Sequence, residues 1–209
     1  MTDELKNILE RVRLLYNKYG IKSITMDDVA RELGISKKTL YQYVVDKTDL
    51  VQKTMQLGYE KHQCEFDAVF CCDKNAIEEL IDMHRLVNGT MKEFNPSTDY
   101  DLRKYYPEIF RQIQEMRKQR MYQNVLSNLK KGKEQGIYRK ELNESVIAKL
   151  TIIRIFQMLD NETVTLTEFT SPEFFTEVLI YHIRGIANEK GLNILEQNIH
   201  KLIEKQNEK

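Results

Sequence analysis

The sequence lacks any apolar run near the roughly 18 residues that a membrane-spanning helix needs, and this excludes an integral membrane protein. It also lacks net charge, because 32 Lys and Arg residues balance 32 Asp and Glu residues in a chain of 209. Affinity for a charged partner therefore has to come from the local distribution of charge. The opening MTDELKNILERV is acidic and amphipathic, without the basic start and apolar stretch of a secretory signal, so we expect the protein to stay in the cytoplasm.

Cysteines are few and odd in number. Cys64, Cys71 and Cys72 are the only three, and an odd count in a reducing compartment argues against a disulfide framework. His62 lies nearby and invites a metal or redox site. On a helix, however, Cys64 and Cys71 lie two turns apart, and neighbouring residues point in different directions. We expect three thiols and no metal site; metal or thiol sensing is the alternative.

Motifs of the common enzyme classes are also missing. The sequence has no nucleophile elbow, no phosphate-binding glycine loop, no HExxH and no paired-cysteine site. These absences disfavour an enzyme, and we expect neither a catalytic residue nor a cofactor.

The segment TMDDVARELGISKKTLYQYVVDK, residues 25–47, predicts two short helices joined by a tight turn. Thr25 followed by Asp28 is typical of a capping box that starts a helix. Gly34 can adopt the positive φ that ends this helix, and Ser36 can cap the next one. The apolar face of the first helix consists of Val29, Ala30 and Leu33.

The second of these helices predicts a basic, donor-rich face. Leu40 faces inward, and small residues at Ala30 and Gly34 allow the two backbones to approach each other. The side chains expected to project away from the apolar side are Lys37, Lys38, Thr39, Gln42 and Tyr43. No acid lies between Ser36 and Val45, so this helix is locally basic in a neutral chain. Such a helix is typical of proteins that read the DNA major groove; the alternative is an αα-hairpin with a solvated basic face.

Apolar residues at helical spacing predict one helix before this motif and a long one after it. The first ends at Gly20, and its stripe consists of Leu5, Ile8, Leu9, Val12, Leu15, Tyr16 and Tyr19. The long helix is capped by Asp46 with Asp49. It runs from Lys47 toward Phe70, so it can connect a DNA-binding unit to the rest of the chain.

The remainder of the chain also predicts helices. Residues 75–94 form one, and residues 95–99, which read NPSTD, form a turn or loop. Pro107 opens a further helix that continues toward Gly136. The inward residues at its start are Ile109, Phe110, Ile113 and Met116.

A set of aromatic, methionine and histidine side chains could line a cavity for a small effector. Its members are Phe66, Phe70, Met83, His84, Phe94, Phe110, Met121, Tyr122, Phe156 and Met158. The alternative is that they simply fill the core, which is the commoner role of such residues at helical spacing.

Two helices, at about residues 145–160 and 172–187, carry more apolar surface than a single stripe. A helix that is apolar on most sides has to be covered on most sides. We therefore expect these two helices to pack on the same pair of a second chain, as a four-helix interface about a two-fold axis. A buried helix pair inside a monomer is the alternative.

The N-terminal residues also match the pattern of a known family without a gap through about residue 55. The matching residues are Ile8, Leu9, Leu15, Tyr16, Gly20, Ile24, Thr25, Val29, Ala30, Gly34, Ile35, Ser36, Thr39, Leu40, Tyr41, Tyr43, Lys47 and Leu50. In this pattern the chain resembles the N-terminal domain of the tetracycline repressor family. GKEQGIYRKEL at 132–142 and RGIANEKGL at 184–192 look like segments common in the C-terminal domains of that family.

The resemblance implies an all-α homodimer whose helix-turn-helix binds a near-palindromic operator and whose C-terminal domain usually binds a small effector. It implies that Thr25 and Met26 open a helix against phosphate and that Tyr41 and Lys47 contact the DNA backbone. The complete set of expected DNA-binding residues is Thr25, Met26, Ser36, Lys37, Lys38, Thr39, Tyr41, Gln42, Tyr43 and Lys47. The family's pattern is not followed at Val12, Lys38 and Val44. Because a long cation at Lys38 could reach phosphate or guanine, base preferences cannot be taken from relatives.

The sequence predicts two domains. Residues 1–47 form a three-helix DNA-binding domain with its helix-turn-helix at about 24–43. Residues 48–209 form a helical effector-binding and dimerisation domain, in which 48–70 is the connecting helix. The expected function is that of a sequence-specific transcriptional regulator, a repressor released from a palindromic operator by a small molecule. One alternative is an effector-independent DNA-binding protein of the same fold, acting in chromosome organisation or division. An enzyme is the other.

Overall fold

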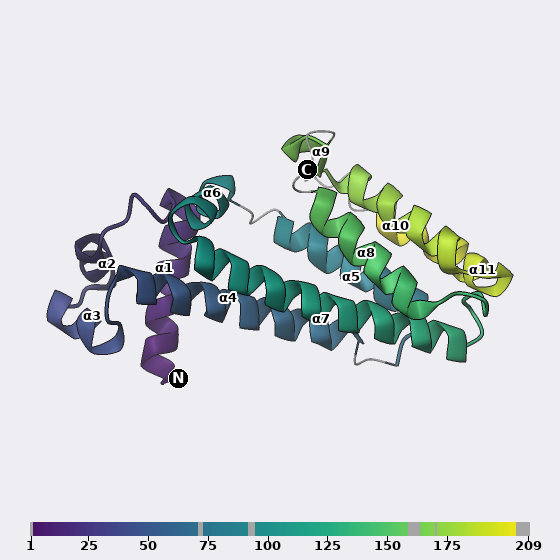
Figure 1. Ribbon diagram of the computed structural model, residues 1–209, viewed down its shortest axis with the longest axis horizontal. Helices are drawn as coiled ribbons and strands as arrows, with labels where there is room; N and C mark the ends of the chain where they lie inside the picture. Colours follow the sequence, from purple (N-terminus) through teal and green to yellow (C-terminus); the bar gives the residue numbers. More distant parts are fainter. Residues whose placement is uncertain (1, 71–72, 92–94, 159–163, 170, 204–209) are drawn as a thin grey trace. The chain divides into compact units, whose positions relative to one another are not determined.

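In the computed structural model the chain is built of helices, which confirms the all-α prediction (Figure 1). The structure describes residues 2–70, 73–91, 95–158, 164–169 and 171–203. The helices are α1 Asp3–Tyr19, α2 Met26–Leu33, α3 Lys37–Tyr43, α4 Lys47–Phe70, α5 Ala76–Met91, α6 Pro96–Tyr105, α7 Pro107–Glu134, α8 Glu144–Met158, α9 Leu166–Phe169, α10 Pro172–Ile186, α11 Glu189–Asn198 and α12 His200–Ile203. Within these ranges the strand-like pairing is one isolated antiparallel bridge between Tyr138 and Ala187. Of the helices described, none combines the length and apolar character needed to cross a bilayer.

The helices divide into two compact units. The first holds Met1–Cys64 and Glu93–Arg117, and the second holds Glu65–Lys92 and Lys118–Lys209. Because α6 and the start of α7 pack with the N-terminal helices, the first unit extends beyond the expected domain of residues 1–47. The functional division at residue 47 stays a prediction, since packing alone does not tell which residues bind DNA and which bind an effector.

The first unit is built around α1. Thr2 caps this helix, and its buried residues are Ile8, Leu9, Val12 and Tyr16. Gly20 ends it at φ 79°, as predicted. Tyr19 departs from the predicted stripe, because it is 52% exposed and carries the Lys18 ammonium 4.9 Å above its ring. The apolar stripe therefore stops one turn before the helix does.

Residues 95–99 form the cap and first turn of α6, and the turn or loop predicted for them is wrong. The Asn95 side chain accepts the amide two residues on at 2.8 Å. Pro96 takes the first helical position, where its missing N–H costs nothing. The helix is held to α1 because the Thr98 hydroxyl donates to the carbonyl of Tyr16 at 2.7 Å. The same residue types favour a turn and a helix start, and the contact with α1 selects the helix.

α7 begins at Pro107, as predicted. Ile109 and Ile113 are buried in the core of the first unit. Met116 was predicted to face inward as well, but it is 38% exposed. The buried stripe of α7 in this unit ends at Ile113, so the next turn is left at the surface.

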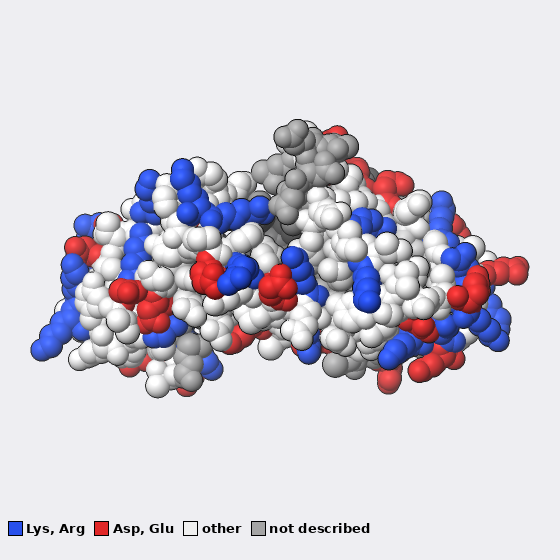
Figure 2. All heavy atoms as spheres, in the orientation of Figure 1, with Lys and Arg blue, Asp and Glu red and all other residues white. Residues whose placement is uncertain are grey.

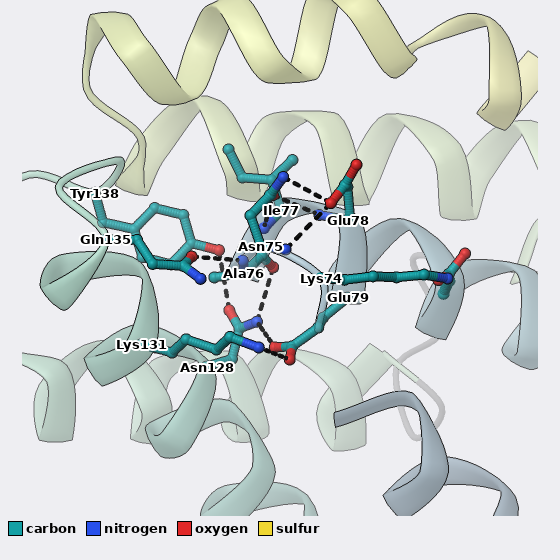
Figure 3. A network of polar contacts seen from close by, with 11 residues as sticks. Lys74, Asn75, Ala76, Ile77, Glu78, Glu79, Asn128, Lys131, Gln135 and Tyr138 are labelled. Atoms are coloured by element: carbon teal, nitrogen blue, oxygen red, sulfur yellow. Dashed lines mark hydrogen bonds and ion pairs between the residues drawn. The ribbon is translucent and has the colours of Figure 1, made fainter. Parts of the chain in front are cut away.

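A buried polar network ties α5 to α7 in the second unit (Figure 3). Asn128 on α7 donates to the carbonyl of Ala76 at 2.8 Å and to the carboxylate of Glu79 at 2.9 Å. Glu79 is 1% exposed and forms an ion pair with Lys131 at 2.5 Å. The hydroxyl of the fully buried Tyr138 donates to Asn128 at 3.0 Å. Since the buried charge is paired and hydrogen-bonded, the network holds these elements in one arrangement.

Candidate DNA-binding surface

α2 begins at a reciprocal cap on Thr25, which confirms the prediction. The Thr25 hydroxyl accepts the Asp28 amide at 3.1 Å, and the Asp28 carboxylate accepts the Thr25 amide at 3.0 Å. Hydrogen bonds from Thr25 hold the pKa of Asp28 below its usual value, so this carboxylate is ionised next to the positive end of the helix dipole. The start of α2 is thereby fixed.

Met26 does not offer its side chain to a ligand. It is 9% exposed and belongs to the core of the first unit. Its backbone amide, at the first position of α2, is one of those that lack a partner within the helix. If Met26 contacts a phosphate, as expected, it does so through this backbone amide and not through its side chain.

Gly34 ends α2 in the left-handed conformation, at φ 71° and ψ 26°, as predicted. The amides of Gly34 and Ile35 close the turn by donating to carbonyls in the last turn of α2. Arg11 on α1 reinforces this end, since its guanidinium donates to the carbonyls of Glu32 at 2.6 Å and Leu33 at 3.2 Å. The contribution of Arg11 was not predicted, because a contact between residues far apart in the sequence leaves no local pattern.

α3 is capped by Ser36, whose hydroxyl accepts the Thr39 amide at 3.0 Å. Leu40 is fully buried beneath the helix. The cap and the inward leucine are both confirmed. The hydroxyls of Ser36 and Thr39 lie 2.8 Å apart, so each is oriented by the other before any ligand arrives.

Lys38, Tyr41 and Gln42 form the exposed face of α3. In the part of the chain that the structure describes, neither Lys38 nor Gln42 has a hydrogen-bond or ion-pair partner. Lys37 differs, because its ammonium lies 3.0 Å from the carboxylate of Asp27 on α2 and this hydrogen bond raises the pKa of Lys37. An acid-free stretch of sequence thus does not give an acid-free surface, since α2 brings a carboxylate to α3.

Tyr43 does not project away from the apolar side, and that part of the prediction is wrong. Its ring packs against the core of the first unit, and its hydroxyl hydrogen-bonds Glu4, which raises the pKa of Tyr43. Tyr43 follows Leu40 by three residues, so both lie on the buried face of α3; this spacing was the available signal. Glu4, Thr39 and Tyr43 line part of a shallow hollow of about 140 Å³.

Lys47 begins α4 beside the connection between α1 and α2. Its ammonium donates to the carbonyl of Lys22 at 3.3 Å. Burial lowers the pKa of Lys47 below its usual value. The carboxylates of Asp101 and Asp28 raise the pKa and offset part of this effect. An ammonium has three N–H groups, so hydrogen-bonding capacity remains for a phosphate.

Lys53 ties the end of α3 to α4, a role that was not predicted. Its ammonium donates to the carbonyl of Tyr43 at 2.9 Å and to the carboxylate of Asp49 at 2.8 Å. Asp49 also accepts the Val45 amide at 2.8 Å. The predicted cap is confirmed, because the Asp46 carboxylate accepts the Asp49 amide at 2.8 Å. Together these contacts fix α3 at its C-terminal end.

The described residues expected to line an effector cavity are divided between the two units, and their role in binding an effector stays a prediction. Phe110 packs against the core of the first unit, with the Arg103 guanidinium 4.8 Å above its ring. In the second unit Met83, Met121 and Tyr122 pack against the core, and Phe66, Phe70, Phe156 and Met158 are half-buried. Phe94 lies outside the described residues. His84 is buried with its Nε2 3.2 Å from the Thr176 hydroxyl.

One of the three cysteines lies within the described residues. Cys64 is a free, exposed thiol, while Cys71 and Cys72 lie outside the described residues. Over the ranges that the structure describes, no three His, Cys, Asp or Glu side chains gather as metal ligands.

Sequence comparison places the helix-turn-helix in a known family. The model of the family described as "Bacterial regulatory proteins, tetR family" matches residues 8–54. The "Uncharacterized HTH-type transcriptional regulator YvaF" of Bacillus subtilis (strain 168) is 28% identical over 186 residues, which cover 88% of this chain and 96% of that protein.

Solved structures share the fold at lower identity. A transcriptional regulator from Cytophaga hutchinsonii ATCC 33406 is 18% identical with a TM-score of 0.72, over 90% of this chain and 100% of the other. SmeT, the repressor of the Stenotrophomonas maltophilia multidrug efflux pump SmeDEF, is 13% identical with a TM-score of 0.60, over 90% of this chain and 92% of the other. At these identities the likeness shows the fold alone. Together with the family match over residues 8–54, it shows that the chain has the fold of TetR-type transcriptional regulators and carries the N-terminal domain of the tetR family of bacterial regulatory proteins.

Proposed function

We propose that this protein is a sequence-specific transcriptional regulator that binds a near-palindromic operator as a homodimer, through a DNA-binding domain of residues 1–47. One observation carries the proposal. Ser36 caps the start of α3, the buried Leu40 packs beneath it, and Lys53 hydrogen-bonds its last residue. The opposite face of α3 is polar and exposed to solvent. A short helix fixed in this way is suited to the DNA major groove. The protein would work in the cytoplasm, where bacterial DNA lies.

Phosphate contacts and base contacts fall to different side chains in this proposal. Lys47 and Tyr41 bind the backbone, together with the hydroxyls and amides at the starts of α2 and α3. Gln42 and Lys38 reach base edges, because the amide of Gln can pair with adenine and an ammonium with guanine. Lys37 has to give up its ion pair with Asp27 to contact DNA. Its net contribution to the free energy of DNA binding is therefore reduced by the loss of that ion pair.

The proposed dimer uses α8 and α10. Val146, Leu150 and Ile153 on α8 are 49%, 56% and 49% exposed, and Tyr181 on α10 is 76% exposed. The opposite sides of both helices are buried in the core of the second unit. Helices that are buried on one side and apolar on the other need a further partner. A second copy supplies it with closed symmetry. Residues 159 and 160 of the expected interface lie outside the described residues.

We further propose that the second unit binds a small effector and that the protein is a repressor released by it. The second unit holds a buried polar pair, His84 and Thr176, and Met83 and Tyr122 pack partly buried against its core; residues of both kinds are typical of a small-molecule site. α4 runs without a break from Lys47 to Phe70, so it can transmit a conformational change to the helix-turn-helix. A coupling of about 1–3 kcal/mol would lower DNA affinity by roughly 5- to 150-fold. SmeT offers a precedent, since it is itself a repressor.

Selection of bound sequences from random duplex DNA by the purified protein tests the DNA-binding proposal. We expect two inverted half-sites with centres about 34 Å apart or a multiple of that distance. Gln42→Ala should relax the preference at one position in each half-site. The proposal is wrong if no sequence is enriched and no duplex forms a complex at low ionic strength.

The effector-independent alternative requires a separate test. Small molecules that raise the melting temperature of the protein would be added to the complex with the selected operator. Release of the DNA supports the repressor mechanism. A compound that stabilises the protein and leaves operator affinity unchanged favours a DNA-binding protein that works without an effector.

A further inference from the structure

The first unit carries a second group of cations, outside the helix-turn-helix. The lysine–tyrosine patch consists of Lys22, Tyr100, Lys104 and Tyr105, from the connection between α1 and α2 and from α6. The Lys22 ammonium lies 2.8 Å from the Tyr105 hydroxyl and 4.7 Å from the centre of its ring. The Lys104 ammonium lies 2.8 Å from the Tyr100 hydroxyl and 5.5 Å from the centre of the Tyr105 ring. Lys and Arg side chains gather over α6 in Figure 2.

The charges of these two lysines are not neutralised by carboxylates. Among the described residues neither Lys22 nor Lys104 forms an ion pair; their partners are phenol oxygens and aromatic faces. Of the two acids of α6, Asp99 pairs with Arg103 at 2.7 Å. Asp101 accepts the backbone amide of Lys22 at 2.8 Å and keeps its negative charge, which stands against the two positive charges of Lys22 and Lys104. The patch is therefore locally basic in a chain without net charge.

The chemistry of the patch suits a partner with several anionic oxygens. The Lys22 ammonium uses one N–H on a phenol oxygen, and the Lys104 ammonium hydrogen-bonds both Tyr100 and Tyr105, so each ammonium keeps at least one N–H for a ligand. Each phenol oxygen accepts from an ammonium and keeps its own O–H to donate. The rings remain accessible, because Tyr100 is 56% and Tyr105 38% exposed. Lysine and tyrosine donors of this kind are typical contacts of the DNA sugar–phosphate backbone.

The patch is continuous with the expected DNA-binding surface. The Lys47 ammonium, an expected phosphate contact, donates to the carbonyl of Lys22 at 3.3 Å. Lys22 in turn contacts Tyr105. A row of donors thus leads from the start of α4 to the end of α6.

We propose that the lysine–tyrosine patch binds the DNA backbone at phosphates next to the one contacted by Lys47, so that α6 is part of the DNA-binding surface. This inference rests on the proposed function. It adds contacts that strengthen binding to every sequence and do not change which bases are preferred.

The test compares wild type with a variant carrying Lys22→Gln and Lys104→Gln. Affinity for the selected operator and for an unrelated duplex of equal length would be measured by fluorescence anisotropy over a range of salt concentrations. Two lost phosphate contacts should lower the slope of log K against log salt by about 1.8 and weaken both complexes about tenfold at physiological salt. The sequence selected from random DNA should stay the same.

Three further variants control the comparison. Lys22→Arg with Lys104→Arg keeps both charges and should keep the salt slope of wild type. Lys130→Gln with Lys190→Gln removes two exposed charges from the second unit and should leave the slope unchanged as well. Lys104→Gln alone alters one exposed side chain and should lower the slope by about 0.9; this single variant is decisive if the double variant has a lower melting temperature than wild type.

The outcomes separate this inference from the function on which it rests. If wild type binds the operator and the glutamine variants keep its salt slope, the patch does not bind DNA and the regulator proposal stands. A second result would also exclude the patch from the DNA-binding surface. In that case the glutamine variants keep the DNA affinity of wild type and lose only the ability to bind a small anion or an acidic protein. If wild type binds no duplex at all, both proposals are wrong.

Discussion

Gly132 lies on α7 where the ring of Tyr138 packs against the helix backbone. A Cβ at this position would overlap atoms of that ring. Tyr138 cannot retreat easily, because it is fully buried and its hydroxyl is held by Asn128. We therefore expect Gly132→Ala to lower the free energy of unfolding by about 1–3 kcal/mol, as measured by urea denaturation.

Gly89 provides the matched control for this substitution. It also lies inside a helix, α5, but an added Cβ would meet no other side chain or distant backbone of the described residues within 4 Å. Because alanine is the better helix former, Gly89→Ala should raise stability by up to about 1 kcal/mol. Equal destabilisation by the two alanines would contradict the packing argument for Gly132.

Lys47 tests the expected division between backbone contacts and base contacts. If its ammonium binds a phosphate, Lys47→Ala weakens binding to all duplexes alike and lowers the slope of log K against log salt by about 0.9. Anisotropy titrations at several salt concentrations measure both quantities. Lys47→Arg, which keeps the charge, should keep the slope. An unchanged slope in the alanine variant would remove Lys47 from the phosphate contacts.

We expect His84 to make the stability of the second unit depend on pH. It is 5% exposed, and burial lowers its pKa from 6.5 to about 4, with the nearby Arg85 acting in the same direction. Between these values the unfolded chain binds a proton that the folded chain does not, so stability falls as the pH falls. The loss due to His84 between pH 7 and pH 4.5 is about 2 kcal/mol.

Urea denaturation of wild type and His84→Gln at these two pH values measures this contribution. Stability should fall less on acidification in the His84→Gln variant than in wild type, whereas replacement of the exposed His200 by Gln should not alter the difference. Equal losses in wild type and His84→Gln would contradict the assignment.

At the level of elements, the structure of the helix-turn-helix could be predicted because its signals are local. The caps at Thr25 and Ser36 and the turn at Gly34 each join residues no more than a few positions apart. The supports supplied by Arg11 and Lys53 could not be predicted, because they join different elements. Sequence periodicity gives the face of a helix but not the residues that approach it from elsewhere.

The same limit explains what was wrong or incomplete in the candidate site. Lys38 and Gln42 are exposed as expected, since solvent is the default for polar residues opposite a buried leucine. The carboxylate beside Lys37 comes from Asp27 on another helix and could not be read from α3 itself. Tyr43 is the reverse case, because its spacing from Leu40 already indicated the buried face. Its ring packs against the core of the first unit, while its polar hydroxyl is typical of exposed positions.

The reciprocal cap of α2 gives a prediction for that element. Thr25→Ala removes the hydroxyl that accepts the Asp28 amide, and we expect a loss of about 1 kcal/mol in the free energy of unfolding. Operator affinity should fall as well, since the start of α2 is no longer fixed. Thr25→Ser keeps an acceptor and should restore most of the stability. A stable alanine variant with normal affinity would show that the cap is dispensable.

For the whole molecule, specificity depends on two copies of a short helix. One half-site read by α3 offers few base contacts, but two half-sites joined in one dimer bind with the effective concentration of a linked pair. The exposed apolar face of α8 and α10 is the proposed link. The surface that holds two copies together is thus predicted to determine DNA affinity without touching DNA.

Leu150→Glu tests this dependence directly. Leu150 is 56% exposed on α8, so a charge there should be tolerated by the monomer fold and should repel a second copy across a two-fold axis. We expect sedimentation to show a single chain at micromolar concentration and operator affinity to fall by about 10²- to 10⁴-fold. Leu14→Glu is the matched control, because Leu14 is an exposed leucine, 60% accessible, on α1, and it should leave the dimer intact. If Leu150→Glu were a monomer with unchanged operator affinity, each chain would have to recognise its site alone, and the symmetric operator would lose its physical reason.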